Sequence, residues 1–145
     1  MKRPSAASWA SSPAVRNVMK ANVAKDTVPE LAIRRFLHAS GYRYRLHVRP
    51  DAKLNRRADI VFRKAQVAVF VDGCFWHGCP LHFVEPKTNP EYWRSKIARN
   101  RIRDEETTKA LRKSGWKVVR VWEHQAPSAA AARIRRVVDE KLSDV

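Results

Sequence analysis

Residues 58–72, with the sequence ADIVFRKAQVAVFVD, decide the fold that we expect for this chain. They contain two short β-prone runs, 58–62 and 67–71, separated by a polar stretch, and they therefore predict a central hairpin of two strands. Asp59 lies in the first strand and Asp72 lies just past the end of the second. Such a hairpin would bring both carboxylates to one edge of the sheet.

The sequence before the hairpin predicts one helix and one strand. Thr27 and Glu30 form a capping box, and apolar residues with helical spacing follow as far as Gly41. Residues 42–48 then alternate strictly between apolar and polar positions, which is typical of a half-buried strand. The polar face of this strand is basic and includes His47.

The sequence after residue 88 predicts helix, strand and helix. Asn89 is the expected N-cap of a long helix from about Pro90 to Lys113. A β-prone run follows at 117–122, and Ser128 is the expected cap of the last helix.

The resulting order, α-β-β-β-α-β-α, favours an α/β fold with one mixed sheet flanked by helices. We expect a single domain over residues 13–145, preceded by a loose, Ser- and Ala-rich arm over 1–12. The chain has no apolar run long enough to cross a bilayer, so we expect a cytoplasmic protein.

The charge of the chain is strongly positive. Thirty Lys and Arg residues stand against fourteen Asp and Glu, which gives a formal net charge of +16. Such an excess is typical of proteins that bind polyanions, and nucleic acid is the leading partner. An anionic membrane surface is a weaker alternative, because the basic residues form no single amphipathic helix.

Two thiols and an imidazole follow the second hairpin strand. Cys74, Cys79 and His82 lie within nine residues, and tetrahedral Zn²⁺ would need one more ligand, for which His124 is the best candidate. The alternative is a packed pair of cysteines with surface histidines. The spacing fits neither a zinc finger nor a zinc deaminase, so such a zinc would stabilise a loop.

Asp59 and Asp72 are candidate ligands for a second metal ion. Oxygen ligands at strand ends hold Mg²⁺ in many enzymes that hydrolyse phosphodiesters. The alternative is that each carboxylate caps a turn or pairs with one of the many cations.

Several segments together resemble one family. They are Glu30 in TVPE, 44–48 (YRLHV), 58–62 (ADIVF), 69–80 (VFVDGCFWHGCP), Tyr92-Trp93, Lys96-Ile97, Asn100, Arg103-Asp104 and 115–123 (GWKVVRVWE). In this order they resemble the very short patch repair endonucleases, the Vsr family of bacterial DNA mismatch nicking enzymes. The resemblance covers about residues 16 to 125.

The resemblance implies a restriction-endonuclease-like core of the PD-(D/E)XK type, a structural zinc and dependence on Mg²⁺. It also implies nicking of double-stranded DNA on the 5′ side of the T in a T:G mismatch, the lesion left when 5-methylcytosine deaminates. The protein would act as a monomer on the bacterial nucleoid, with mismatch-repair proteins as candidate partners.

The resemblance also implies a role for individual residues. Asp59 becomes the main Mg²⁺ ligand, and His77 becomes the base that activates the attacking water. Asp104 would orient His77 and fix its tautomer. Glu30 would reach the metal site through water, although its place in the capping box explains it equally well. The zinc ligands become Cys74, Cys79, His82 and His124.

DNA contacts follow from the same resemblance. Phe75 and Trp76 resemble an aromatic wedge that enters between base pairs, with Met19 entering from the other side and Asn100 on the DNA-binding surface. Two positions depart from the usual patterns. Cys74 stands where nucleases of this superfamily carry Lys, so His77 must act in its place, and some family members carry His at the position of Asp72. Whether Asp72 binds metal directly is therefore open.

Two other functions remain as alternatives. One is a zinc-stapled DNA-binding module without catalysis, and the other is a related nuclease with a different DNA target. Asp59 and His77 separate the first alternative from an enzyme, because a pure binder gains nothing from carboxylates that face phosphates.

Overall fold

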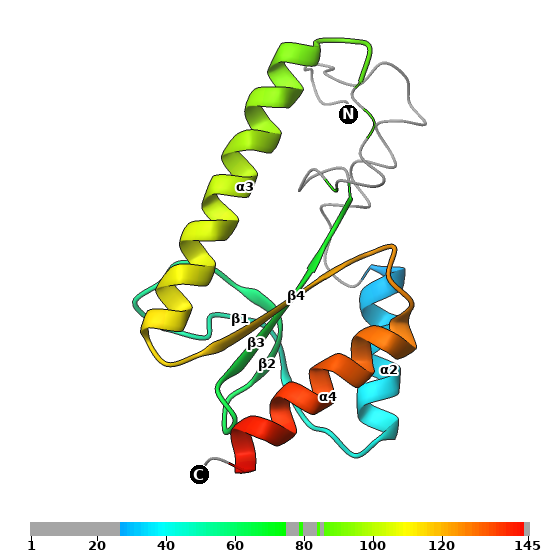
Figure 1. Ribbon diagram of the computed structural model, residues 1–145, viewed down its shortest axis with the longest axis vertical. Coiled ribbons are helices and arrows are strands. Elements are labelled where there is room, and N and C mark those ends of the chain that lie inside the picture. Colours follow the sequence, from blue (N-terminus) through cyan, green and yellow to red (C-terminus); the bar gives the residue numbers. More distant parts are fainter. Residues whose placement is uncertain (1–26, 75–78, 80–83, 85, 144–145) are drawn as a thin grey trace.

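A four-stranded mixed sheet with helices on both sides forms the centre of the protein (Figure 1). The computed structural model describes residues 27–74, 79, 84 and 86–143. In chain order the elements are α2 (Val28–Ala39), β1 (Arg45–Val48), β2 (Ala58–Phe62), β3 (Val67–Asp72), α3 (Pro90–Lys113), β4 (Lys117–Trp122) and α4 (Pro127–Ser143). The α/β class and the order predicted from the sequence are confirmed. The arm expected at 1–12 lies outside the described residues.

The strands follow the order β1-β2-β3-β4 across the sheet. The pairs β1/β2 and β2/β3 are antiparallel, so the predicted central hairpin is present. β3 and β4 are parallel, with Asp72 beside Trp122 at their carboxyl ends. Because α3 is the crossover between these two parallel strands, it must return along the sheet before β4 begins.

Two apolar clusters cover the two faces of the sheet. On one face, Val67 and Val69 of β3 pack in the cluster that contains residues of α2 and α4. On the other face, Ala68 and Phe70 pack with Leu111 at the end of α3. Figure 1 shows the same arrangement, with α3 on one side of the sheet and α2 and α4 on the other. This burial on both faces explains why β3 reads as a nearly continuous apolar run.

Local signals predicted most helix boundaries. Gly41 and Gly115 have φ values of 90° and 92° and follow the ends of α2 and α3, as glycine does where a left-handed residue ends a helix. Asn89 is the N-cap of α3, but its side chain makes no capping hydrogen bond. The expected cap at Ser128 is wrong, because α4 begins at Pro127. Proline suits the first helical position, where no backbone N–H is needed.

The strand expected over 42–48 is shorter in the structure. β1 contains only Arg45–Val48. Tyr42 and Tyr44 still face the core, where their rings meet Phe62 edge-on at centroid distances of 6.4 and 5.8 Å. The alternation therefore predicted burial correctly for residues 42–46 but not for His47, whose left-handed backbone turns a polar position inward. Strand pairing begins only where β2 provides a partner.

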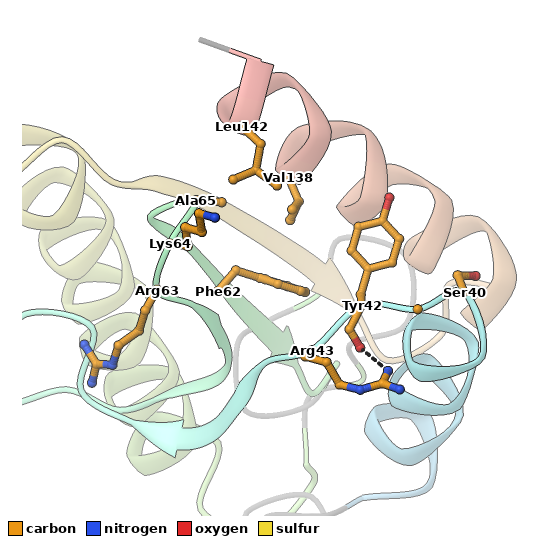
Figure 2. A pocket seen from close by; sticks show the side chains of 10 residues that line it. Ser40, Tyr42, Arg43, Phe62, Arg63, Lys64, Ala65, Val138 and Leu142 are labelled. Carbon is orange, nitrogen blue, oxygen red and sulfur yellow. Dashed lines mark hydrogen bonds between the residues drawn. The ribbon is translucent and has the colours of Figure 1, made fainter. Parts of the chain in front are cut away.

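A pocket of about 420 Å³ lies between the β2–β3 turn, the end of α2 and the end of α4 (Figure 2). Phe62, Val138 and Leu142 give it apolar walls, and Arg43 and Lys64 are basic. Phe62 is at the end of β2 away from Asp59, and the residues that line the pocket include no carboxylate. This pocket is therefore separate from the acidic groups described below.

Among the described residues, no helix combines the length and the apolar character that crossing a membrane requires.

Candidate active site and metal centre

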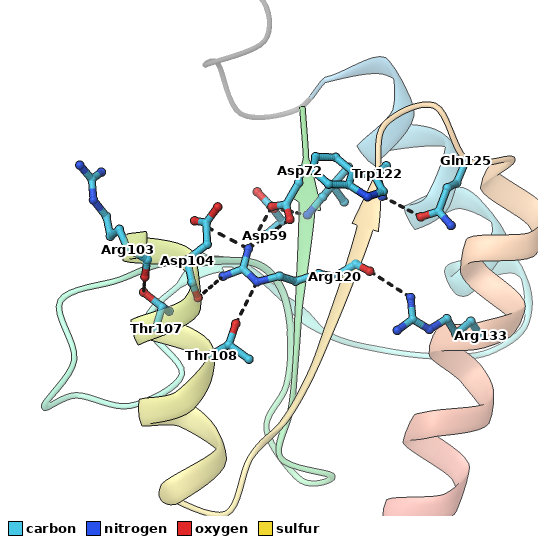
Figure 3. Close-up of polar contacts among 11 residues, drawn as sticks. Asp59, Asp72, Arg103, Asp104, Thr107, Thr108, Arg120, Trp122, Gln125 and Arg133 are labelled. Carbon is cyan, nitrogen blue, oxygen red and sulfur yellow. Dashed lines mark hydrogen bonds and ion pairs between the residues drawn. The ribbon is translucent and has the colours of Figure 1, made fainter. Parts of the chain in front are cut away.

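The hairpin places Asp59 and Asp72 at the same end of the sheet (Figure 3). Asp59 is the second residue of β2, and Asp72 is the last residue of β3. The Asp59 carboxylate accepts a 2.7 Å hydrogen bond from the backbone N–H of Val71, which fixes it against the neighbouring strand. The juxtaposition expected from the sequence is confirmed.

Asp59 sits in surroundings that oppose its negative charge. Burial, with smaller contributions from the Glu30 and Asp72 carboxylates, raises the pKa of Asp59 to about 6, against the opposing effects of the Val71 N–H and His47. These two favourable contacts only partly offset burial beside other carboxylates, so the negative charge of Asp59 is incompletely compensated. A divalent cation would supply that charge, so this donor set fits Mg²⁺.

Glu30 lies in the first turn of α2 and is almost fully buried, with 2% of its surface exposed. Its backbone N–H donates to the Thr27 hydroxyl, as the capping signal predicted. The Glu30 carboxylate is held by Arg34 Nη1 at 3.1 Å and by His47 Nε2 at 3.0 Å. The backbone of Glu30 thus takes part in the helix cap, while its side chain is directed toward β1 and the sheet.

His47 joins Glu30 to Asp59. Its Nε2 lies 3.0 Å from Glu30 Oε2, and its Nδ1 lies 3.8 Å from Asp59 Oδ1. One donor atom from each of the three residues lies within 4.8 Å of the others, close enough to hold one metal ion. Sequence reasoning assigned His47 only to a basic strand face. The pairings Leu46 with Ile60 and Val48 with Ala58 place it opposite Asp59, and only the strand register reveals this.

Asp72 is paired with a cation that the sequence analysis did not identify. Arg120 Nη1 donates to both oxygens of the buried Asp72 carboxylate, at 3.0 and 3.2 Å. The same guanidinium donates to Thr108 and to the backbone carbonyl of Asp104, and it lies 4.2 Å from the centre of the Phe70 ring. Figure 3 shows Arg120 between the strand end and α3. Arg120 thereby ties β3, β4 and α3 together beside Asp59.

Two further candidate residues lie on α3. The Asp104 carboxylate is 3.9 Å from Arg120 Nη1, so it shares this cation with Asp72. Asn100 is one helical turn earlier on α3 and is partly buried. The other residues assigned to catalysis and DNA contact lie outside the described residues; they are Met19, Phe75, Trp76 and His77.

Three of the four expected zinc ligands converge. His124 Nδ1 lies 3.2 Å from Cys74 Sγ and 3.6 Å from Cys79 Sγ. The fourth, His82, lies outside the described residues. Both cysteines are free thiols, and burial, together with the neighbouring Cys79 thiol, raises the pKa of Cys74. Two sulfurs and one imidazole nitrogen fit Zn²⁺, whose charge would stabilise the thiolates that burial disfavours.

The chain is similar to known DNA nicking enzymes. The family model described as DNA mismatch endonuclease Vsr matches residues 11–82. Type II nicking enzyme V.NaeI of Lentzea aerocolonigenes is 45% identical over 118 residues, which cover 80% of this chain and 71% of that protein. Type II nicking enzyme V.XorIIP of Xanthomonas oryzae is 42% identical, with 86% and 91% covered.

A similar likeness extends to the DNA mismatch endonuclease Vsr of Escherichia coli. It is 34% identical over 128 residues, which cover 87% of this chain and 76% of that protein. The matched region includes the acidic sheet end and most of α3, so the site described above lies within the similarity. The chain belongs to the Vsr family of DNA mismatch endonucleases.

Proposed function

We propose that this protein is a Mg²⁺-dependent endonuclease that nicks DNA on the 5′ side of the T in a T:G mismatch. The observation that carries the proposal is the convergence of Glu30, His47 and Asp59 at one end of the sheet in a member of this family. The formal charge of +16 supports binding to a polyanion. We also propose that the mixed sheet is a restriction-endonuclease-like core of the PD-(D/E)XK type.

A few residues have distinct parts in the proposed mechanism. Asp59 would hold the metal ion. Glu30 would lie on the far side of the His47 imidazole from Asp59. When bound there, Mg²⁺ supplies positive charge for the phosphate and lowers the pKa of water. His77 would accept the proton of the attacking water, and Asp104 would orient the His77 imidazole.

We assign Asp72 a positioning role rather than direct ligation. Its carboxylate already receives two hydrogen bonds from Arg120, a pairing that balances its charge locally. The pair would fix the end of β3 beside Asp59 and hold α3, with Asp104, against the sheet.

Recognition of the mismatch would depend on residues next to the metal centres. Phe75 and Trp76 would enter between base pairs with Met19 opposite, because unstacking costs least at a mismatch. Asn100 would contact the DNA. Zn²⁺ held by Cys74, Cys79, His82 and His124 would fix the segment that carries the wedge.

A different DNA target is the second candidate, because the two relatives named first above are called type II nicking enzymes. Those names do not specify a mismatch. The alternative target is therefore a particular flanking sequence, required together with or in place of the T:G pair.

The test uses duplexes that differ at a single base pair, T:G, C:G or T:A, within a library of flanking sequences. Each strand carries a different label, and nicking is followed with and without added Mg²⁺. We expect one cut, 5′ of the mismatched T, and only with the metal. Equal cutting of the C:G duplexes would contradict mismatch specificity.

Variants separate catalysis from binding. Asp59→Ala should abolish nicking and leave duplex binding intact or tighter, since it removes negative charge near the phosphates. His77→Ala should lower the single-turnover rate by about 10²- to 10⁴-fold, the usual size of a general-base contribution. Asp51→Asn serves as the control, because the Asp51 carboxylate accepts hydrogen bonds from the Lys53 N–H and the Ser114 hydroxyl and belongs to neither candidate metal site. Nicking by Asp59→Ala at the wild-type rate would contradict the metal-ligand role of Asp59. Duplex binding by the wild type without nicking of any duplex would leave the binding-module alternative.

A further inference from the structure

His47 occupies the centre of the acidic site, and no role was expected for it. Its side chain is largely buried, with 16% exposed, and it lies between Glu30 at 3.0 Å and Asp59 at 3.8 Å. Its backbone has a φ of 51°, in the left-handed region, although it lies inside β1. Non-glycine residues rarely adopt this conformation, and histidine is among those that tolerate it best.

We propose that His47 is a nitrogen ligand of the catalytic metal ion, with Glu30 holding the opposite edge of its imidazole. The inference rests on the proposed function, because it concerns the same metal ion. It adds an imidazole to a site that would otherwise be built from carboxylates and water.

The separation of the donor atoms supports shared coordination. Metal–ligand bonds to nitrogen or oxygen are about 2.1 Å long, so two ligands of one ion lie at most about 4.2 Å apart. The distance of 3.8 Å between His47 Nδ1 and Asp59 Oδ1 is within this limit, and it is too long for a hydrogen bond.

The contact with Glu30 also has the form expected of a metal-bound histidine. A ligating imidazole usually donates its other N–H to a carboxylate, which fixes the tautomer and the ring orientation. A proton on Nε2, which lies 3.0 Å from Glu30 Oε2, would leave the lone pair of a neutral ring on Nδ1, the atom 3.8 Å from Asp59 Oδ1. Arg34 holds Glu30 from the other side, so the carboxylate itself is fixed.

The backbone conformation is held by neighbouring strands. Arg57 donates a 3.0 Å hydrogen bond to the His47 carbonyl, and residues on both sides of His47 pair with β2. An uncommon backbone conformation that the surroundings impose is often found at functional sites. Here it accompanies a side chain placed between two buried or partly buried carboxylates.

The proposed ligand set predicts a preference among metal ions. Mg²⁺ strongly favours oxygen ligands, whereas Mn²⁺, the first ion of the divalent transition-metal affinity series, accepts an imidazole nitrogen beside carboxylate oxygens more readily. Mn²⁺ should therefore bind the DNA-free protein more tightly than Mg²⁺ does. Removing the imidazole should weaken Mn²⁺ binding by about tenfold or more. Glu30→Gln, which changes the group that orients the imidazole, should also weaken it, by about 10- to 100-fold.

The experiment measures Mn²⁺ bound to zinc-loaded protein without DNA. Electron paramagnetic resonance gives the affinity, and pulsed measurements detect the nitrogen of a coordinated imidazole. We expect nitrogen coupling in the wild type and in the control His38→Ala, which changes an exposed histidine at the end of α2. We expect its loss in His47→Gln and His47→Asn, whose folding is checked by circular dichroism.

Absence of nitrogen coupling in the wild type would overturn the proposal, whether or not the variants fold. Coupling that persists in a folded His47 variant, with unchanged Mn²⁺ affinity, would overturn it as well. Because these measurements use no DNA, they are independent of nicking. A wild type that binds Mn²⁺ through nitrogen but cuts no duplex would contradict the proposed function and leave this ligand assignment standing.

Discussion

Replacing Asp59 with Asn should stabilise the metal-free protein at neutral pH. The pKa of Asp59 is raised from 3.8 to about 6, mainly by burial and then by neighbouring carboxylates. A raised carboxyl pKa means that ionisation is harder in the folded protein than in the unfolded chain. Ionisation of Asp59 therefore lowers the free energy of unfolding progressively as pH rises from about 4, and the full cost is present above about 6.

The size of the effect follows from the shift. At about 1.4 kcal/mol for each pKa unit, the ionised Asp59 costs up to about 3 kcal/mol. The side chain is 27% exposed, and a neutral amide oxygen accepts the Val71 N–H less strongly, so we expect a gain of about 1 to 3 kcal/mol. For a chain of this length, that corresponds to a rise in Tm of roughly 4 to 10 °C.

The stability advantage of Asp59→Asn should depend on pH. As pH falls through 6 toward 4, the native carboxyl takes up a proton before the unfolded one does, and the wild type recovers stability. At pH 4.5 the advantage of Asp59→Asn should fall to about one third of its value at pH 7.5. Adding Mg²⁺ at pH 7.5 should stabilise the wild type more than the variant, because the ion binds the native carboxylate.

Urea unfolding followed by circular dichroism measures these free energies at both pH values without added divalent cations. Asp51→Asn is the matched control. Hydrogen bonds from the Lys53 N–H and the Ser114 hydroxyl lower the pKa of Asp51, so its replacement should bring no gain at pH 7.5. An Asp59→Asn protein that is no more stable than the wild type at pH 7.5, or whose gain is equal at both pH values, would refute the reasoning.

Three further predictions concern the groups around this site. Arg120→Met should destabilise the protein by about 3 to 5 kcal/mol, because it leaves the buried Asp72 charge without its partner. Adding Asp72→Asn should recover much of that loss, and additive effects in the double-mutant cycle would contradict the pairing. Cys79→Ser should reduce bound zinc well below one ion per chain and lower stability, as measured by metal analysis and thermal unfolding. A variant that keeps one zinc ion per chain would show that Cys79 is not a zinc ligand. Raising the salt concentration should weaken binding to every duplex steeply while changing the preference for the mismatch much less. The double variant Phe75→Ala with Trp76→Ala should reduce that preference in competition binding, and unchanged discrimination would contradict the wedge assignment.

The sequence alone determined the element order and the position of the acidic sheet end. The two apolar runs around residues 63–66 could pair only as a hairpin, because apolar strands must be buried and a short polar turn joins them. Once they pair, Asp59 and Asp72 lie at the same end whatever the rest of the fold. The boundaries of α2 and α3 were equally local, since capping residues and glycines with positive φ act within one turn.

Only the tertiary structure decided which charges meet at that sheet end. His47 reads as one more basic residue of a strand face, and Arg120 is one of thirty cations in the chain. The register of β1 against β2 sets His47 opposite Asp59, and the packing of α2 brings Glu30 to its other edge. The parallel pairing of β3 with β4 sets Arg120 against Asp72. Electrostatic contacts act over a few ångströms in space, and residues separated by 12 to 48 positions come that close only when the sheet has formed.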